Sequence, residues 1–383
     1  MRFLRRISTR RLLALCASVV AAAVGGAAIA IAATAGGPVP APKPLAQAIH
    51  DALTAPAVDG VSARISFTNH LIDSSSLGEG ADTLLTGASG RLWASHDGRV
   101  RIELQSDGGG GDSQVVVDGN RFMVYDAGSD TVYRGTLPQH RQHAGAQRTD
   151  RIPSVAAIKR SLTHLMGDVA VSGARPGDIA GRPAYTVRLT PKHDAGRVAG
   201  AALAWDATTG VPLRAALYAV GDTSPVLELA VTDISYGKVA GSTFAIQPPA
   251  TAKAVDLTPR DTQGAPVQTK LPFQLNAPAT LAGLPRSNVK LIASDEHPAA
   301  LVTYGKGLGG VAVIESQART PSVQAPQTDH GGLQLPSVSL GGVSGQELDT
   351  ALGSAITFSR GGVDYIVLGS VTPSVAKAAA RGL

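Results

Sequence analysis

Short segments of alternating polarity recur through the middle of this sequence and constrain its fold more than any other feature. In the segments 100–104, 187–189, 213–217 and 227–231, apolar residues alternate with charged or small ones. Turn-forming pairs lie between such segments: Asp97-Gly98, Asp118-Gly119, Gly128-Ser129 and Thr209-Gly210. Alternation at period two is typical of antiparallel strands that bury one face. About ten such strands at regular spacing are too many for a flat open sheet, so we expect a curved, mainly β fold.

Two helices are predicted among these strands. The first covers 45–53, and the second covers 154–166, directly after Pro153. In the second helix, apolar side chains recur at helical spacing, and Lys159 and Arg160 fall between them. We expect this helix to lie across the apolar face of the sheet as a lid, with these side chains facing the sheet: Ile158, Leu162, Leu165 and Met166.

Proline-rich stretches divide the 383 residues, a length that itself suggests two domains at about 100–200 residues each. The predicted divisions are a signal or anchor segment at 1–35, a linker at 36–44, a curved-sheet domain at 45–249, a second linker at 250–269 and a small α+β domain at 270–383. In the small domain we expect strands at 300–304, 311–315 and 365–369, a helix at 344–355 opened by a capping box, and a last helix ending at Arg381.

The first 35 residues have the features of an export signal. Five arginines precede the run Leu12–Ala35, which has 24 residues, no formal charge and the single cysteine, Cys16. A signal-peptide core has about 7–15 apolar residues, whereas spanning a bilayer takes about 20. The run therefore favours a retained membrane anchor, with the body outside the cytoplasm, while Ala33-Thr34-Ala35 leaves cleavage after Ala35 as the alternative.

The charge of the body argues against nucleic acid as a partner. Removing the five leading arginines from the 34 basic residues leaves 29, which equals the 29 acidic residues. The basic isoelectric point therefore arises from the arginines of the targeting segment, because the remainder of the chain is neutral.

No sequence motif supports catalysis, a cofactor or a metal site. Gly305–Gly310 satisfies G-x-G-x-x-G but leads into a predicted strand, whereas a dinucleotide site needs a helix there, so we interpret it as a hairpin turn. Gly108–Gly111 lacks the Lys-Ser/Thr of a phosphate-binding loop, and His140 and His143 lie in a polar stretch with no nearby third ligand. G-x-S-x-G and H-E-x-x-H are both absent from the sequence. We therefore expect a protein that is not an enzyme and has no cofactor.

The remaining candidate site is the apolar face of the curved sheet. Few aromatic residues are available to fill its hollow side, since they make up 4% of the chain. Burying an acyl chain there supplies about 0.8 kcal/mol per CH₂ group, or on the order of 10 kcal/mol for a long chain. The side chains predicted to line this cavity are Ile65, Phe67, Leu92, Ile102, Leu104, Val117, Phe122, Val124, Val187, Leu189, Leu203, Trp205, Leu217 and Leu229.

An ordered set of segments over about 200 residues resembles the family of outer-membrane lipoprotein carriers (LolA) and its relatives. After the helix 45–53, these segments are 61–67, 90–93, 117–125, 185–191, 206–213, 236–237 and 244–249. The resemblance implies an incomplete antiparallel β-barrel whose open side is plugged by helices, and a lipid or an acylated protein as the ligand. The carriers place an Arg-Pro pair after the second of these segments, where the arginine helps to handle acyl chains, but this chain has His96-Asp97. That departure argues against strict lipoprotein shuttling and leaves general lipid binding or sensing open.

The division into two domains is also similar to that of RseB-type periplasmic regulators. In that family, a carrier-like domain precedes a small domain, and the pair senses envelope stress and binds an anti-sigma factor. Leu271-Pro272-Phe273 opens the small domain in a comparable way. The resemblance therefore implies, as an alternative function, a regulator that contacts a protein partner through residues 270–383.

Overall fold

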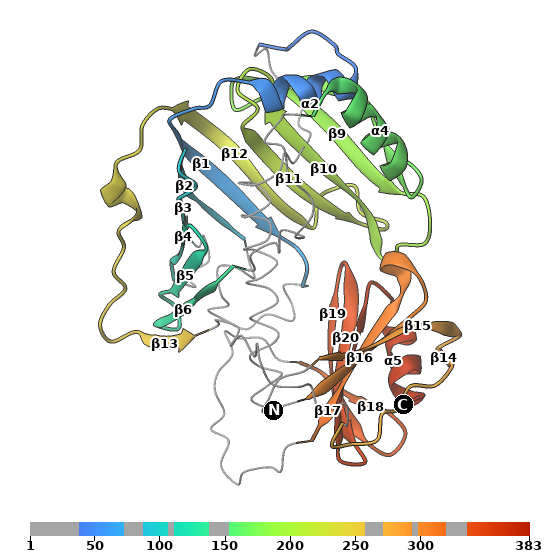
Figure 1. Cartoon of the computed structure of the whole chain (residues 1–383). Helices are drawn as coiled ribbons and strands as arrows, with labels where there is room; N and C mark the ends of the chain where they lie inside the picture. The colour runs from blue at the N-terminus through green and yellow to red at the C-terminus, as the bar shows by residue number, and fades with distance from the viewer. Residues whose placement is uncertain are drawn as a thin grey trace.

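A computed structural model of the chain describes residues 38–72, 87–105, 111–137, 153–256, 271–292, 298–318 and 335–383 (Figure 1). The chain is mainly β, with one curled sheet forming a half-barrel and a second, smaller sheet beside it. No helix within the described ranges has the length and apolar character needed to cross a bilayer. The predicted anchor at 12–35, the pair His140 and His143, and most of the 108–111 loop lie outside these ranges.

The half-barrel is a thirteen-stranded sheet in the order β13-β6-β5-β4-β3-β2-β1-β12-β11-β10-β9-β7, with β8 also paired to β9. Its strands are β1 (Gly60–Asn69), β2 (Ala88–Ser95), β3 (Val100–Gln105), β4 (Ser113–Asp118), β5 (Arg121–Asp126), β6 (Thr131–Thr136), β7 (Val169–Val171), β8 (Arg175–Ile179), β9 (Arg182–Pro191), β10 (Val198–Asp206), β11 (Pro212–Ala219), β12 (Leu227–Tyr236) and β13 (Lys253–Asp256). The predicted alternating segments all fall in these strands, and the predicted turn pairs lie between strands or, for Asp118-Gly119, begin at the last residue of one, so this part of the sequence interpretation is confirmed.

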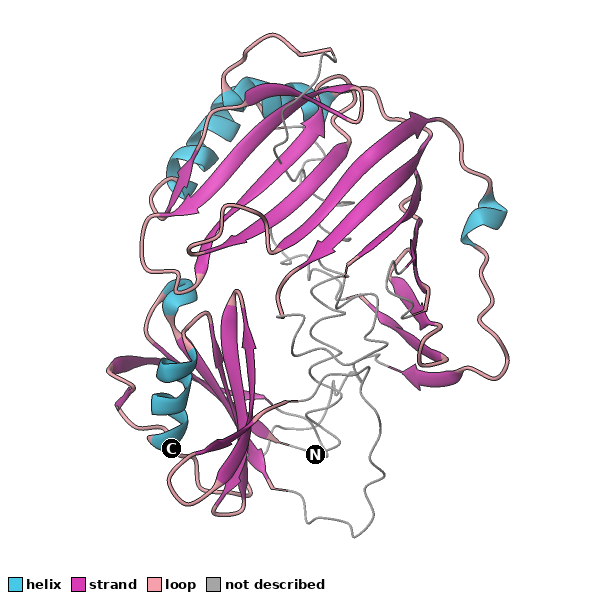
Figure 2. Ribbon diagram, turned by 180° about the vertical axis from the view of Figure 1, so that it is seen from behind, coloured by secondary structure: helices cyan, strands magenta, loops and turns pink. Residues whose placement is uncertain are grey.

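The last strand of this sheet, β13, lies within the stretch predicted as a linker at 250–269. It pairs in parallel with β6, and Lys253 is opposite Thr131. The 3-10 helix η2 (Gly241–Phe244) lies between β12 and β13. The chain therefore returns to the far edge of the half-barrel before it enters the second sheet (Figure 2).

Both predicted helices of the half-barrel are present, as α2 (Leu45–Thr54) and α4 (Val155–Leu165). Ser154 caps α4, because its hydroxyl accepts a hydrogen bond from the backbone N–H of Ala157. The buried side of α2 packs on β9 and β10 through Ala48, and α4 packs mainly against α2. The two helices therefore cover one end of the sheet's apolar face (Figure 1).

The second sheet has eight strands in the order β14-β15-β16-β17-β21-β20-β19-β18. Its elements are β14 (Thr280–Leu281), β15 (Leu284–Ile292), β16 (Ala299–Tyr304), η3 (Gly307–Gly309), β17 (Val311–Gln317), β18 (Ser337–Ser339), β19 (Ser344–Thr350), β20 (Gly353–Arg360), β21 (Val363–Gly369) and α5 (Pro373–Arg381). The glycine-rich segment 305–310 joins β16 to β17 and contains η3, which confirms its interpretation as a turn.

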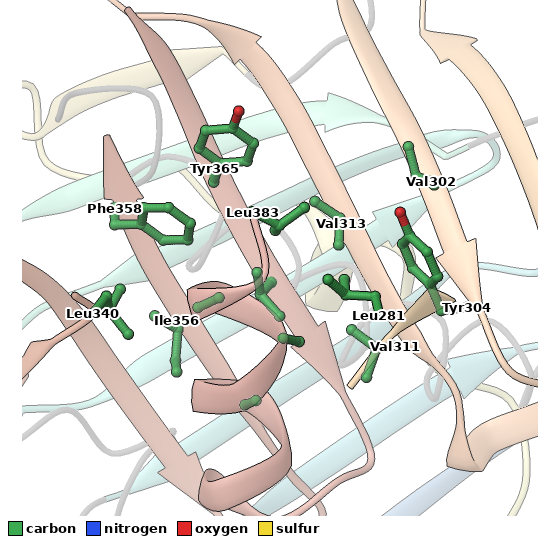
Figure 3. Packing of buried hydrophobic residues seen from close by; sticks show 14 of the residues in the cluster. Leu281, Val302, Tyr304, Val311, Val313, Leu340, Ile356, Phe358, Tyr365 and Leu383 are labelled. Atoms are coloured by element: carbon green, nitrogen blue, oxygen red, sulfur yellow. The ribbon is translucent and has the colours of Figure 1, made fainter. Parts of the chain in front are cut away.

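A core of its own holds the second sheet against α5 (Figure 3). Ala376, Ala379 and Ala380 of the helix are fully buried against residues of the sheet such as Ile356 and Val367. Small residues on this face of α5 let the helix approach the sheet closely. Pro373 is its first residue, a position that proline favours because its fixed φ suits a helix start.

The predicted helix at 344–355 is wrong. Ser344–Thr350 forms β19, which pairs with β20 in a hairpin. A Cβ atom on Gly345 would lie 2.8 Å from the carbonyl oxygen of Thr357, so this glycine permits close pairing of the two strands. Glu347, taken as the acid of a capping box, instead forms an ion pair with Lys377 of α5 at 2.9 Å. Tertiary pairing therefore overrode the local helix signal.

Candidate functional site

Cross-strand pairing places the predicted cavity residues on one continuous face of the half-barrel. Residues directly opposite one another in antiparallel strands share a face. One row of opposite residues runs from Leu203 through Ala215 and Leu229 to Phe67, on β10, β11, β12 and β1. The same face continues across β2 to β5 through these pairs: Ala63 with Leu92, Leu92 with Ile102, Val100 with Val117, and Val117 with Phe122. Period-two alternation thus predicted a shared face over at least nine strands.

Burial divides these residues into two groups. The side chains in the packed core are Ile65, Ile102, Leu104, Val117, Val124, Val187 and Trp205. The half-buried ones are Phe67, Leu92, Phe122, Leu189, Leu203, Leu217 and Leu229. Only the second group has surface left to offer a ligand in this structure.

Most of the half-buried residues lie together in the middle of the sheet. Beside the row Leu203–Ala215–Leu229–Phe67, a second row runs from Leu189 through Ala201 and Leu217 to Leu227. We call these two rows the central strip. Neighbouring strands are about 4.8 Å apart, so the strip spans about 19 Å from β9 to β1. Ala201 and Ala215 lie between the leucines of the two rows, and their short side chains make the strip shallower at these positions.

A packed cluster lies on each side of the central strip. On one side, side chains of β1 to β5 such as Ile65, Ile102 and Val124 contact one another. On the other side, α2 covers Val187 and Trp205, and the Trp205 ring lies 5.9 Å from that of Tyr185. Phe67 and Leu229 also pack against the first cluster, and Leu189 and Leu203 pack against the second. Of the large side chains in the strip, only Leu217 and Leu227 belong to neither cluster.

The structure corrects the expected orientation of the lid helix at its C-terminal end. Ile158 of α4 is buried at 7% exposure and Leu162 is half-buried, as a covering stripe requires. Leu165 and Met166 are 42% and 43% exposed, so these two side chains do not cover the sheet. The helix packs on α2, and Leu165 and Met166 at its C-terminal end lie in solvent.

A buried carboxylate that the sequence interpretation did not identify fixes the turn between β10 and β11. Asp206 has no exposed surface and accepts hydrogen bonds from Arg182 Nε at 3.1 Å, from the Tyr236 hydroxyl at 2.7 Å and from the backbone N–H groups of Thr208 and Thr209. Burial raises the pKa of Tyr236 to about 12, so this phenol stays a donor. The turn carries Gly210, whose backbone lies against α2 at Ala52. The hydrogen bonds to Asp206 therefore fix the β10–β11 turn, which lies against α2.

The His96-Asp97 pair lies in the turn between β2 and β3. Asp97 forms an ion pair with Arg99 at 2.7 Å and accepts a hydrogen bond from Ser95. These contacts hold the pKa of the Asp97 carboxyl well below its usual range. The position where the carriers have Arg-Pro is therefore a self-contained turn in this chain, because its charges are satisfied locally.

The described residues contain no cluster of three or more His, Cys, Asp or Glu side chains arranged to hold a metal ion. A cleft of about 440 Å³ lies in the second sheet's domain, between the segment 272–276 and the turn joining β20 to β21. Its lining is mixed, with Phe273, Asn276, Arg360 and Tyr365 among its residues. It lies apart from the apolar face.

No family model matches this sequence, and no curated protein matches it. Among solved structures, the chain is similar to MucB in the complex of MucA and MucB from Pseudomonas aeruginosa, with 18% identity, a TM-score of 0.41 and coverage of 88% of this chain and 94% of that one. It is also similar to a LolA superfamily protein from Nitrosomonas europaea, with 12% identity, a TM-score of 0.23 and coverage of 53% and 98%. These neighbours are of the two kinds that the sequence resemblance named. All these TM-scores are below 0.5, and the functional proposals below depend on the geometry of this chain.

Proposed function

We propose that this chain is an exported protein of the cell envelope that binds a lipid or the acyl chains of a lipoprotein on the central strip. The observation that carries the proposal is the pairing of Leu203, Ala215, Leu229 and Phe67 in one row of partly exposed apolar residues. The export signal places the chain outside the cytoplasm. It is held there by an anchor at 12–35 or secreted after cleavage at Ala35. The protein acts without catalysis and without a cofactor.

Apolar contact alone supplies enough free energy for this function. Each fully buried CH₂ group contributes about 0.8 kcal/mol, so a long acyl chain gains on the order of 10 kcal/mol when it is enclosed and about half of that when only one side contacts the strip, before entropic costs. Binding of this kind needs a continuous apolar surface rather than directional hydrogen bonds. The strip offers such a surface, and α2 packs on the strands at one end of it.

Uptake of a fluorescent fatty acid by the purified chain tests the proposal, together with native mass spectrometry of co-purified lipids. We expect Leu217→Gln to reduce probe affinity about ten-fold, because it places an amide in the strip at a residue outside the packed clusters. Val220→Gln is the matched control, since Val220 is 64% exposed just beyond the end of the same strand. Absence of any acyl species and of probe uptake would exclude the proposed ligand class.

A second proposed function is that of a regulator that binds a protein partner through residues 270–383. It is favoured by the separate core of the second sheet, which contributes no residue to the apolar face. Removing 270–383 should then abolish capture of the partner and leave fatty-acid uptake intact. Equal capture by the shortened chain would refute this function without affecting the first.

A further inference from the structure

On one side the second sheet ends in the two-residue strand β14, and among the described residues most of the outer edge of the next strand, β15, has no partner strand. β14 pairs with β15 only at its start, through Thr280 with Pro285 and Leu281 with Leu284. Beyond Arg286, whose backbone N–H donates to the carbonyl oxygen of Ala279, no described residue pairs with the outer edge of β15 up to Ile292. Unpaired N–H and C=O groups of such an edge are a template for another strand.

The other sheet edges of the described chain are short. The half-barrel ends on one side in β13, with four residues, and on the other in β7 and β8, with three and five, which both pair with β9. The opposite edge of the second sheet is β18, also with three residues. Short edge strands are one of the ways in which proteins prevent unwanted strand addition. β15, with nine residues, departs from this pattern.

Two apolar side chains of β15 face solvent. Val289 and Leu291 are 41% and 37% exposed. They lie opposite Val302 and Ala300 of β16, which are fully buried and belong to the face covered by α5. The apolar face of the second sheet therefore extends past its covered part to the open edge, where one more strand would continue it.

The described residues of this edge carry positive charge, whereas Asp295 and Glu296 follow β15 outside the described ranges. The sequence from Leu271 to Ile292 contains Arg286 and Lys290 and no acidic residue. Lys290 lies opposite Leu301, on the face away from Val289 and Leu291. An added strand that matches this edge thus has apolar residues on one face and acidic residues on the other, in alternation. A second copy of β15 lacks such acidic residues, because its only charged residues are Arg286 and Lys290.

We propose that the outer edge of β15 binds an extended acidic segment of a protein partner by strand addition. The backbone of the segment supplies the hydrogen bonds, its apolar side chains contact Val289 and Leu291, and its carboxylates lie near Lys290. This inference depends on the second proposed function, since it assigns the contact surface of that partner-binding domain.

Fluorescence anisotropy of the full chain with a labelled decapeptide of alternating valine and glutamate tests the inference. We expect saturable binding that weakens as salt rises, and at least ten-fold weaker binding of the same peptide with a central proline, which cannot donate to the edge. The double variant Val289→Glu/Leu291→Glu should also lose at least ten-fold in affinity. Val39→Glu/Val220→Glu adds the same charges at positions that are 62% and 64% exposed and should bind as the parent does.

Equal binding of the proline peptide, or unchanged binding by the β15 variant, would overturn the inference. So would a concentration-dependent dimer that the β15 substitutions abolish, because the edge would then serve a second copy of the chain. Partner capture that is lost on deleting 270–383 but unaffected by the β15 variant would refute this surface while leaving the second proposed function standing. Fatty-acid uptake by the variant reports whether its half-barrel is intact.

Discussion

Arg197 Nη1 lies 2.5 Å from Asp349 Oδ1 and so joins the two sheets across 152 positions of sequence. The same contact includes Ser370, whose carbonyl oxygen and hydroxyl both accept from the backbone N–H of Arg197 at 3.0 Å. Ser370 also donates its hydroxyl proton to the carbonyl oxygen of Ala195. The turn between β9 and β10 is therefore bound to the end of β21 by backbone as well as by charge.

The ion pair itself should contribute little to stability. Its side chains are 28% and 46% exposed, and pairs of this kind contribute about 0.2–1 kcal/mol. We expect Arg197→Ala and Asp349→Asn to show a coupling energy within that range in a double-mutant cycle measured by urea denaturation. A coupling above about 2 kcal/mol would show that water is excluded from the contact more completely than its exposure indicates.

Backbone contact at Gly196 should matter more than the ion pair. Its φ is +63°, and a Cβ atom there would lie 1.4 Å from the carbonyl oxygen of Ser370. Gly119 has a similar φ of +59° with nothing within 4 Å, which makes it the matched control. Each alanine substitution costs about 1–2 kcal/mol in the left-handed region, and only Gly196→Ala should also separate the sheets. Distance measurements between labels on the two domains would detect this, and equal distances in both variants would contradict it.

Asp206 should be among the most sensitive positions in the half-barrel. Replacement by alanine leaves Arg182 and the donors of the β10–β11 turn without their acceptor, so we expect a loss of about 3–5 kcal/mol in the free energy of unfolding. Tyr236→Phe removes one charge-assisted hydrogen bond and should cost about 1.5–3 kcal/mol. Chemical denaturation of both variants measures the difference, and an equal cost would show that the backbone donors contribute little.

Glu315 of β17 should make the second sheet less stable as pH rises. It is fully buried, and burial raises the pKa of its carboxyl, although its Oε2 accepts from the backbone N–H of Asn276 at 2.8 Å. A raised pKa in the folded state means that the stabilising contribution is complete below the unfolded pKa of about 4.3 and is lost as pH rises through the folded value. Thermal unfolding of Glu315→Gln should therefore depend less on pH between 4 and 8 than that of the parent. A parallel dependence in both would assign the effect to other groups.

The half-barrel was predictable because its signals are local and repeat. Alternation in segments such as 100–104 and 227–231 fixes both the strand and the face that it buries, and Asp-Gly pairs mark the turns. The segment 344–355 failed for the opposite reason, since Ser344 and Glu347 form a local helix signal that long-range pairing with β20 overrides. β13 was missed because four residues with one clear alternation give too weak a signal.

The sequence predicted which side of the sheet carries the candidate site, but not which residues on that side stay exposed. Alternation assigned Leu203, Leu217 and Leu229 to the same side of the sheet as Ile102 and Val124. It contained no information on which of them the curl of the sheet and α2 would cover, because that depends on contacts between distant strands. The exposure of the last turn of α4 could not be predicted for the same reason. Helical periodicity shows that an apolar stripe exists, but it does not show which neighbouring element the stripe contacts.

The contact at Ser370 has a consequence for how the two domains meet. The chain leaves the half-barrel through β13, at the edge farthest in strand order from β9 and β10, where the contact is made. The covalent connection therefore acts as a tether that keeps the local concentration of the two surfaces high. Doubling the length of a tether costs only about 0.6 kcal/mol in closure entropy, whereas cutting it makes the encounter bimolecular. A few hydrogen bonds and one exposed ion pair can then hold the domains together inside one chain, and we expect the same surfaces on separate fragments to associate far more weakly.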